Sequence, residues 1–413
     1  MLKKNFFHAN SACMNTYLVT LVTFSLAIWI YLTFFRGRFW WSDQRLENNN
    51  IDLEHYPDIV AIIPARNEAE ALPKSLPSLL EQNYPGKFSL VLVDDQSTDQ
   101  TGELTHELAQ KMQKIASVTV ISGQPLPLGW TGKLWAMEQG IRYIEESNYK
   151  PDYYLFTDAD IKHDINNINQ LVQKAERDNL ALVSLMVLLK TTKFWEKLLI
   201  PAFVFFFCKL YPFPLVNNPN SNLAAAAGGC ILIRREILEK IGGIQILKQA
   251  LIDDCSLASA VKTYLKAHRD VSYQSIWLGL TESTYSLRDY PTLKSVWDLV
   301  ARTAFTQLHY SPWLLIGSVL GMILTYLIAP LGLIIGLGLN DALIIGISAL
   351  TWLIMTITYL PTLRLYKLPW VWALTLPIIA FLYTMMTIDS AWRYWQGKGG
   401  NWKGRVYSQT DLT

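Results

Sequence analysis

The sequence has little charge for its length. Only 17% of its 413 residues are Asp, Glu, Lys or Arg, whereas 51% are hydrophobic; an average soluble domain is about a quarter charged. This composition excludes an intrinsically disordered chain and disfavours a purely soluble one. The 36 basic residues nearly cancel the 34 acidic ones, which leaves a net charge of +2. We therefore expect no basic surface of the kind that holds nucleic acid.

Cysteine and histidine are scarce as well. The four cysteines (Cys13, Cys208, Cys230, Cys255) are far apart and contain no CxxC pair. We therefore expect no disulfide framework and a protein of a reducing compartment. The six histidines are scattered, and GxSxG, HExxH and GxGxxG are all missing. Neither a serine triad nor a zinc site has support. By contrast, 15 Trp and 20 Tyr are typical of a protein at a membrane interface.

Long uncharged runs occur near both ends of the chain. Tyr17–Phe35 is a 19-residue run without charge, long enough to cross a membrane as a helix. Arg36 and Arg38 follow it directly without a small-residue cleavage site, so residues 1–45 are predicted to be an uncleaved anchor. Three further uncharged blocks predict spanning helices in a C-terminal membrane domain, residues 311–392: Trp313–Leu339, Ala342–Leu363 and Leu368–Ile388.

The topology of these C-terminal helices stays open at this stage. Arg364 and Lys367 place the loop before the last block in the cytoplasm by the positive-inside tendency. Residues 393–413 form a basic tail, which the same tendency also places in the cytoplasm. A single helix that spans the membrane would put the loop before it and the tail after it on opposite sides. One of the blocks is therefore a candidate for an interfacial or re-entrant element.

Residues 52–310 have a different pattern, in which short β-branched runs alternate with helical patterns. This alternation predicts an α/β domain with a mostly parallel sheet and helices on both faces. Ligands of such sheets bind beyond the carboxyl ends of the strands. Within this domain, the apolar stretch 194–216 is interpreted as an amphipathic element at the membrane surface, with a buried core helix as the alternative. The predicted strands are Ile59–Ile63, Phe88–Val93, Val118–Ile121, Tyr153–Phe156 and Ala181–Val187.

Polar clusters follow three of these strands. Pro64–Glu68 (PARNE) is a polar turn that structural caps alone could explain. Val93–Asp99 (VDDQSTD) has three aspartates, more than capping requires, and a carboxylate at a strand end can accept hydrogen bonds from a ribose or base. Asp158 and Asp160 (DAD) could hold a hard divalent cation that shares its other positions with water and phosphates. His163 is interpreted as a surface residue at a helix start.

Two more clusters complete the set. Gly129–Lys133 (GWTGK) opens a helix without matching a P-loop, and its lysine suits a diphosphate by charge. The paired Gly228 and Gly229 would let the backbone approach a ligand closely. Ile252–Cys255 (IDDC) precedes a helical pattern. One of its aspartates is expected to cap that helix, and the other could act as a general base towards an acceptor hydroxyl.

Taken in order, PARNE, VDDQSTD, GWTGK, TDAD, AGGC and IDDCSLA resemble the family 2 glycosyltransferases of the GT-A fold, over about residues 56–310. The segment Asn218–Val261, together with Ala301–Gln307, is most similar to the hopene-associated branch, which is akin to ceramide glucosyltransferases. The resemblance implies a nucleotide pocket lined by Pro64, Asn67, Glu68, Asp94 and Asp95. It further implies Lys133 at the diphosphate, Asp158 and Asp160 at the metal, and Asp254 as the base beside Asp253.

One departure from the family pattern concerns the (Q/R)xxRW segment that polysaccharide synthases often carry. Arg302 can supply the arginine, but Leu299 and Thr303 occupy the flanking positions. The resemblance therefore favours a single inverting transfer over processive synthesis and leaves the role of Arg302 open. The implied partners are Mn²⁺ or Mg²⁺, a nucleotide sugar with a UDP-sugar favoured, and a lipid acceptor.

The acceptor and location are expectations of the same kind. A lipid hydroxyl, in hopanoid or other glycolipid synthesis, is the first hypothesis. A polyprenyl phosphate or a carotenoid acid is the alternative, and a non-catalytic membrane scaffold is the second alternative. The expected location is the inner membrane, with the catalytic domain facing the cytoplasm.

Overall fold

The computed structural model describes residues 2–47, 53–112, 117–268, 272–398, 401–402 and 405–406. The chain divides into two compact units. The sheet unit comprises residues 43–190, 213–290 and 393–413, and the helical unit comprises residues 1–42, 191–212 and 291–392. Most of the predicted basic tail lies outside the described residues; within it the short strands β9 (Asn401–Trp402) and β10 (Arg405–Val406) pair antiparallel.

Within the described residues, the sheet unit contains an 8-stranded sheet in the order β3-β2-β1-β4-β7-β6-β8-β5. The neighbours β1, β2, β3 and β4 pair in parallel, and so do β6 and β8. Strand β7 is antiparallel to β4 and β6, and β5 is antiparallel to β8. The predicted α/β fold class is confirmed, with a mixed sheet. The strands are β1 (Ile59–Ala65), β2 (Phe88–Asp94), β3 (Ser117–Ser122), β4 (Tyr153–Thr157), β5 (Ile161–Lys162), β6 (Leu180–Leu188), β7 (Cys230–Arg234) and β8 (Ser275–Ser286).

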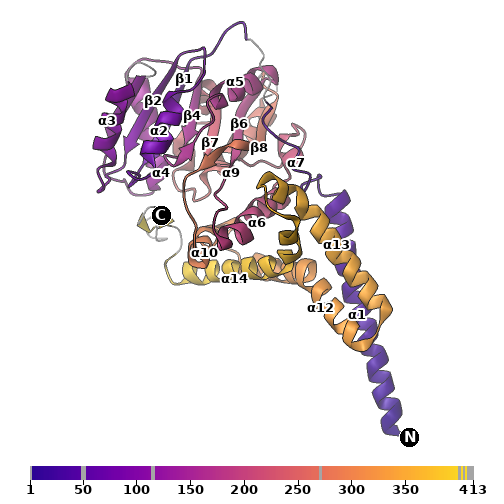
Figure 1. Ribbon diagram of the computed structural model, residues 1–413. Coiled ribbons are helices and arrows are strands. Elements are labelled where there is room, and N and C mark those ends of the chain that lie inside the picture. The colour runs from indigo at the N-terminus through magenta and orange to yellow at the C-terminus, as the bar shows by residue number, and fades with distance from the viewer. Residues whose placement is uncertain are drawn as a thin grey trace. The chain divides into compact units, whose positions relative to one another are not determined.

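Helices cover both faces of the sheet, as Figure 1 shows. Alternate residues of β1 point to opposite faces: Ile59, Ala61 and Ile63 join the core under α2 and α5, whereas Ile62 meets α4 at Gly140. Because β1 is buried along its whole length, its sequence is continuously apolar and does not alternate between apolar and polar residues. The helices of this unit are α2 (Leu72–Leu80), α3 (Thr101–Met112), α4 (Gly132–Glu146), α5 (Asn167–Arg177), α7 (Phe213–Asn217), α8 (Arg235–Lys240), η1 (Ile244–Leu247) and α9 (Asp253–Ala267).

The strand register gathers the polar clusters at one edge of the sheet. Ala65 at the end of β1 pairs with Asp94 at the end of β2. Strand β4 runs parallel to β1 and ends beside them. Because β7 is antiparallel to β4, its first residue, Cys230, pairs with the last residue of β4, Thr157. The glycines before β7 therefore lie next to the DAD cluster after β4.

In the helical unit, four of the described segments are long and apolar enough to cross a membrane: Asn15–Phe34, Pro312–Leu339, Ala342–Leu365 and Trp370–Trp395. Helices α1, α12 and α13 pack side by side, whereas α14 does not run parallel to them (Figure 1). The elements of this unit are α1 (Leu2–Phe34), α6 (Phe194–Leu210), α10 (Leu293–Ala301), η2 (Thr306–Leu308), α11 (Pro312–Met322), η3 (Ile323–Leu327), α12 (Ile328–Leu339), α13 (Ala342–Leu365), η4 (Trp370–Thr375) and α14 (Leu376–Trp395).

The apolar stretch 194–216, predicted as one element of the catalytic domain, is divided between the two units. Helix α6 packs against α10 and α13 in the helical unit, while α7 belongs to the sheet unit. The buried side chains of α6 include Leu199, Ile200, Val204 and Phe205, and these positions are spread around the helix rather than confined to one stripe. Such burial is typical of the core-helix alternative; its depth in a membrane stays a prediction.

Candidate active site

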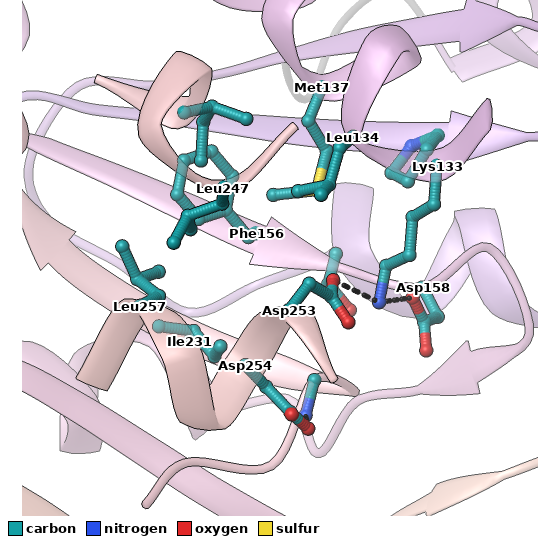
Figure 2. Close-up of a pocket in the computed structure, with 14 residues that line it drawn as sticks. Lys133, Leu134, Met137, Phe156, Asp158, Ile231, Leu247, Asp253, Asp254 and Leu257 are labelled. Atoms are coloured by element: carbon teal, nitrogen blue, oxygen red, sulfur yellow. Dashed lines mark hydrogen bonds and ion pairs between the residues drawn. The ribbon is translucent and has the colours of Figure 1, made fainter. Parts of the chain in front are cut away.

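Four charged side chains meet at the carboxyl edge of the sheet (Figure 2). Lys133, in the first turn of α4, places its Nζ 3.0 Å from Asp158 Oδ1 and 3.3 Å from Asp253 Oδ2. Although burial opposes the charge, these two carboxylates raise the pKa of Lys133 above its usual value. The ammonium group thus bridges the end of β4 and the start of α9, two segments far apart in the sequence.

Asp254 lies beside this bridge and is held by the backbone. Its Oδ2 accepts a hydrogen bond from Gly228 N at 2.8 Å, and its Oδ1 accepts one from Cys255 N at 2.7 Å. Burial and the nearby Asp253 raise the pKa of Asp254 to about 6, although the Lys133 charge and the two N–H donors act in the opposite direction. A fixed carboxylate that titrates near neutral pH is suited to accept a proton.

The prediction that one aspartate of IDDC caps the following helix is wrong. Ile252 occupies the N-cap position of α9 and makes no side-chain cap hydrogen bond, while Asp253 and Asp254 stand in the first turn. Two carboxylates there are favourable because the helix N-terminus carries partial positive charge. Asp253 is consequently directed to Lys133, whereas Asp254 accepts from Gly228 N and, within the first turn itself, from Cys255 N.

Gly228 is required by this close approach. A Cβ at this position would lie 3.1 Å from Lys133 Nζ and 3.3 Å from Asp254 Oδ2, so a side chain would push both groups away. Gly229 is equally crowded, because its Cβ would lie 2.9 Å from Val187 Cγ2. The paired glycines therefore let the loop between α7 and β7 pass directly beneath the charged cluster.

The PARNE and VDDQSTD loops interlock at the ends of β1 and β2. Asn67, with a φ of 52°, accepts hydrogen bonds from Thr98 N at 2.9 Å and Thr98 Oγ1 at 3.4 Å. Arg66 Nη1 donates to Asp95 O at 2.5 Å and lies 3.7 Å from Asp95 Oδ2. The Asp95 side chain is fully buried between the two loops.

The other predicted pocket residues take part in the same loop pair. The backbone N–H of Glu68 donates a hydrogen bond to Thr101 Oγ1 at 2.9 Å. Asp94 Oδ1 accepts from Ser97 N at 3.1 Å. Pro64 precedes the last residue of β1 and lines the pocket that also contains Lys133. All five predicted nucleotide residues therefore come from the adjacent ends of β1 and β2.

The DAD residues are held differently from one another. Asp158 is 38% exposed and pairs with Lys133, whereas Asp160 Oδ2 accepts a hydrogen bond from Ser286 Oγ at 3.0 Å at the end of β8. No group of three or more His, Cys, Asp or Glu side chains among the described residues could hold a metal ion by itself. These two carboxylates, of which Asp158 already attracts the Lys133 cation, nevertheless fit an ion that takes its remaining ligands from water and a diphosphate.

His163 is buried, so its interpretation as a surface residue at a helix start is wrong. It is 4% exposed, with Nε2 3.0 Å from Thr157 Oγ1 and Nδ1 2.9 Å from Asn167 Nδ2. Thr157 Oγ1 donates to Gly229 O at 2.9 Å, so it accepts from the imidazole, and Asn167 donates to Nδ1. This chain of hydrogen bonds fixes the end of β4 against the glycine loop. Sequence inspection gave no signal for it.

The sequence model of the family described as glycosyl transferase family 2 matches residues 60–242. These residues contain Lys133, Asp158, Gly228 and the interlocked loops. This region is a family 2 glycosyltransferase domain. The match includes the first seven strands of the sheet up to β7 and ends before Asp253 and Asp254.

Two curated proteins share sequence with part of this chain. A 4,4'-diaponeurosporenoate glycosyltransferase of Staphylococcus haemolyticus is 34% identical over 113 residues, 27% of this chain and 26% of that protein. An uncharacterized protein of Methanocaldococcus jannaschii is 31% identical over 121 residues, 29% of this chain and 48% of that protein. The match thus spans about a quarter and about half of these relatives.

A solved structure is similar over most of the chain. The mannosyltransferase of Pyrobaculum calidifontis, determined in complex with GDP-Man and Mn²⁺, covers 91% of this chain and 97% of its own, with a TM-score of 0.51 and 17% identity. At 17% identity this similarity supports the fold of the chain and no more.

A pocket adjoins the charged cluster of Lys133, Asp158, Asp253 and Asp254. Apolar side chains of α4, β4 and η1 line its inner part, including Leu134, Met137, Phe156 and Leu247 (Figure 2). Arg302, proposed from the sequence as a catalytic residue, belongs to the helical unit, where its N–H donates to Asp298 O at 3.2 Å at the end of α10. Its catalytic role stays a prediction.

Proposed function

We propose that this protein is a membrane-bound inverting glycosyltransferase that moves a sugar from a nucleoside diphosphate donor to a lipid. The observation that supports this most directly is the cluster in which Lys133 bridges Asp158 and Asp253 beside the backbone-held Asp254. It combines a cation for a diphosphate with a carboxylate that titrates near neutral pH. The family 2 match supplies the reaction class.

The donor end of the proposed site is the pair of interlocked loops. The nucleoside would lie on Pro64, Asn67, Glu68, Asp94 and Asp95, where carboxylates can accept hydrogen bonds from ribose hydroxyls and the base. Lys133 would then exchange its carboxylate partners for the diphosphate, because a doubly charged phosphate group attracts an ammonium more strongly than one carboxylate does. A UDP-sugar is the favoured donor.

Asp158 and Asp160 would hold Mn²⁺ or Mg²⁺ together with the diphosphate. When bound, such an ion neutralises negative charge that develops on the leaving group. Ser286 would keep the Asp160 carboxylate oriented, and Lys133 would add a second positive charge at the same place.

Asp254 would take the proton from the acceptor hydroxyl. The acceptor oxygen then forms a bond to the anomeric carbon while the bond from that carbon to the diphosphate oxygen breaks. The nucleoside diphosphate leaves from the opposite face, so one displacement inverts the configuration. Gly228 N would keep Asp254 aimed at the acceptor hydroxyl.

For the acceptor, a lipid hydroxyl, as in hopanoid or other glycolipid synthesis, is the first hypothesis. The similarity to a diaponeurosporenoate glycosyltransferase over 113 residues favours a second candidate, a carotenoid-type carboxylic acid. The two differ in their need for a base, because a carboxylate is already deprotonated at neutral pH. The proposed location is the inner membrane with the site in the cytoplasm, which Arg36 and Arg38 after α1 support.

The test is a micelle assay of the full chain with Mn²⁺ or Mg²⁺, a panel of nucleotide sugars and a total lipid extract. Released nucleoside diphosphate and new glycolipid are measured by mass spectrometry for the wild type, Lys133→Met, Asp160→Ala and Asp254→Asn. The exposed Lys248 of the same unit provides a matched control, Lys248→Met.

A hydroxyl acceptor predicts that Asp254→Asn loses about 10²-fold or more of the rate, while a carboxylate acceptor predicts a near-normal rate for this variant. In both cases Lys133→Met and Asp160→Ala lose transfer and Lys248→Met keeps it. Absence of nucleotide-sugar binding to the wild type would overturn the proposal and favour a non-catalytic membrane scaffold.

A further inference from the structure

Two basic residues meet in the helical unit without an acidic partner. Arg36 follows α1, and its Nη2 donates to Leu210 O at 3.2 Å. Lys209, in the last turn of α6, donates from Nζ to Tyr326 Oη at 2.9 Å. Among the described residues, no carboxylate oxygen lies within 4.0 Å of either cation, since neither takes part in an ion pair there. This contrasts with Lys133, which has two carboxylate partners.

The ammonium group of Lys209 is directed into the protein. Its Nζ lies 4.6 Å from the ring centre of Tyr326 and 5.3 Å from that of Phe206, and Tyr326 itself is fully buried. A lysine on an apolar surface ordinarily extends its charge into water. Here the Lys209 ammonium instead contacts the hydroxyl and ring of Tyr326 and the ring of Phe206. The surrounding side chains therefore hold it in a defined position.

The local charges do not balance. The C-terminus of α6 offers about half of a negative charge to both cations, and the ring faces of Tyr326 and Phe206 offer cation–π attraction of about 1 kcal/mol each. Removing a charge from water without a counter-charge costs several kcal/mol. An ammonium has three donors, of which Tyr326 takes one, so an anion can bind to the others.

The backbone at Tyr326 is unusual. Residues Ile323–Leu327 (η3) form a π-helical turn between α11 and α12, and such turns occur often at functional sites. Trp29 secures this turn: its Nε1 donates to Thr325 O at 2.6 Å, and its ring meets the Tyr326 ring edge-on at 5.5 Å. The turn thus places the Tyr326 hydroxyl next to Lys209.

The surroundings indicate an amphiphilic ligand. Phe34, Phe35 and Leu210, next to the two cations in sequence, are 69%, 72% and 46% exposed. Aromatic and aliphatic side chains exposed beside basic residues are typical of the membrane interface, where acyl chains meet headgroups. The exposed side chains could contact the chain of a lipid while the cations contact its head.

We propose that Lys209 and Arg36 form a binding site for the phosphate or carboxylate headgroup of an anionic lipid, with Tyr326 holding the lysine in place. Two sources share this chemistry: an anionic membrane phospholipid, and an acidic lipid on its way to or from transfer. The site lies within the helical unit and does not depend on the proposed transferase reaction.

The test is native mass spectrometry of the delipidated full chain with three lipids: dioleoylphosphatidylglycerol, oleate, and zwitterionic dioleoylphosphatidylcholine. We expect one of the two anionic lipids to bind at least about tenfold more tightly than the zwitterionic one, which is about 1.4 kcal/mol. Preference for phosphatidylglycerol assigns the site to a phospholipid, and preference for oleate assigns it to a carboxylate lipid.

Variants decide whether Lys209 carries this preference. Lys209→Met and Arg36→Gln should reduce anionic lipid binding to the level of the zwitterionic lipid, and Lys209→Arg should retain it, which separates loss of charge from loss of folding. Lys197→Met is the matched control, because Lys197 lies on the same helix about three turns away. Equal binding of all three lipids by the wild type, unchanged binding by Lys209→Met, or an equal loss in Lys197→Met would overturn the proposal.

Discussion

At the scale of single residues, Asp254 links the geometry of the candidate active site to a measurable pH dependence. Burial and Asp253 raise its pKa to about 6, so the free protein should hold an active base only above that pH. We expect kcat/KM to fall about tenfold per pH unit below pH 6. Asp253→Asn removes one cause of the raised pKa and should move this acidic limb to lower pH. A limb that stays in place in Asp253→Asn would contradict the assignment.

The same raised pKa has a consequence for stability. A carboxylate whose folded pKa exceeds its unfolded value of 3.8 favours folding below that value and loses this contribution as the pH rises through about 6. Asp254→Asn, which cannot ionise, should therefore have a higher Tm than the wild type at pH 7 and no such advantage at pH 4. Thermal unfolding at both pH values measures the difference, and a greater advantage at pH 4 would show the opposite sign.

His163 gives the converse case. Burial lowers its pKa to about 3, so the neutral ring of the folded state is favoured above the unfolded value of 6.5, and this contribution is lost as the pH falls towards 3. His163→Gln leaves Thr157 and Asn167 incompletely paired, which costs about 1–3 kcal/mol of unfolding free energy at pH 7.

Denaturant unfolding of His163→Gln between pH 7 and pH 5 tests both statements. The stability difference from the wild type should shrink as the pH falls, because only the wild type must protonate a buried imidazole on unfolding. Asn166→Gln, at the position next to Asn167 but outside the chain of hydrogen bonds from His163 to Gly229, is the control. A difference that grows towards pH 5 would rule out a neutral buried histidine.

At the scale of elements, the sequence predicted what depends on local pattern. The runs at residues 59–63, 88–93 and 153–156 lie inside β1, β2 and β4, because β-branched and aromatic residues bounded by polar turns are a strong local signal. The proximity of DAD and AGGC was not predictable in this way. It results from the antiparallel pairing of β7 with β4, which joins segments about 70 residues apart, and pairing partners have no local signature. The burial of His163 was missed for the same reason.

The packing of α4 on the sheet depends on Gly140. A Cβ there would lie 2.7 Å from Ile62 Cγ2 and 3.3 Å from Val93 Cγ2. Gly140→Ala gains about 1 kcal/mol in helix propensity, but overpacking a buried contact costs about 1–3 kcal/mol. We expect a net loss of about 1 kcal/mol in unfolding free energy and a weakened nucleotide affinity, because Lys133 is on the same helix.

Denaturant unfolding and nucleotide titration of Gly140→Ala measure these effects. Glu145→Ala gives an alanine on the exposed side of α4 and should change neither quantity. Should Gly140→Ala be more stable than the wild type, the helix would have room to shift away from β1 and β2.

At the scale of the whole molecule, the direction of α14 bears on the topology that the basic residues left open. Arg364 and Lys367 after α13 and the basic residues after α14 both favour the cytoplasm. Helix α14 is not parallel to α1, α12 and α13 (Figure 1). It also carries Asp389, whose Oδ2 accepts a hydrogen bond from Trp297 Nε1 at 2.7 Å. A carboxylate in this position is costly at the centre of a bilayer and acceptable at its surface.

We therefore predict that α14 lies along the membrane surface, so that the segments before and after it are on the same side. Lys367→Cys and Lys398→Cys, introduced singly into a variant in which the four native cysteines are replaced by serine or alanine, should both react with a membrane-impermeant maleimide in inside-out vesicles and remain unlabelled in right-side-out vesicles. Labelling in opposite vesicle types would show that α14 spans the membrane. The predicted arrangement reconciles four sufficiently apolar segments with the positive charge at both ends of α14, since only α1, the segment Pro312–Leu339 and α13 would then need to enter the hydrocarbon core.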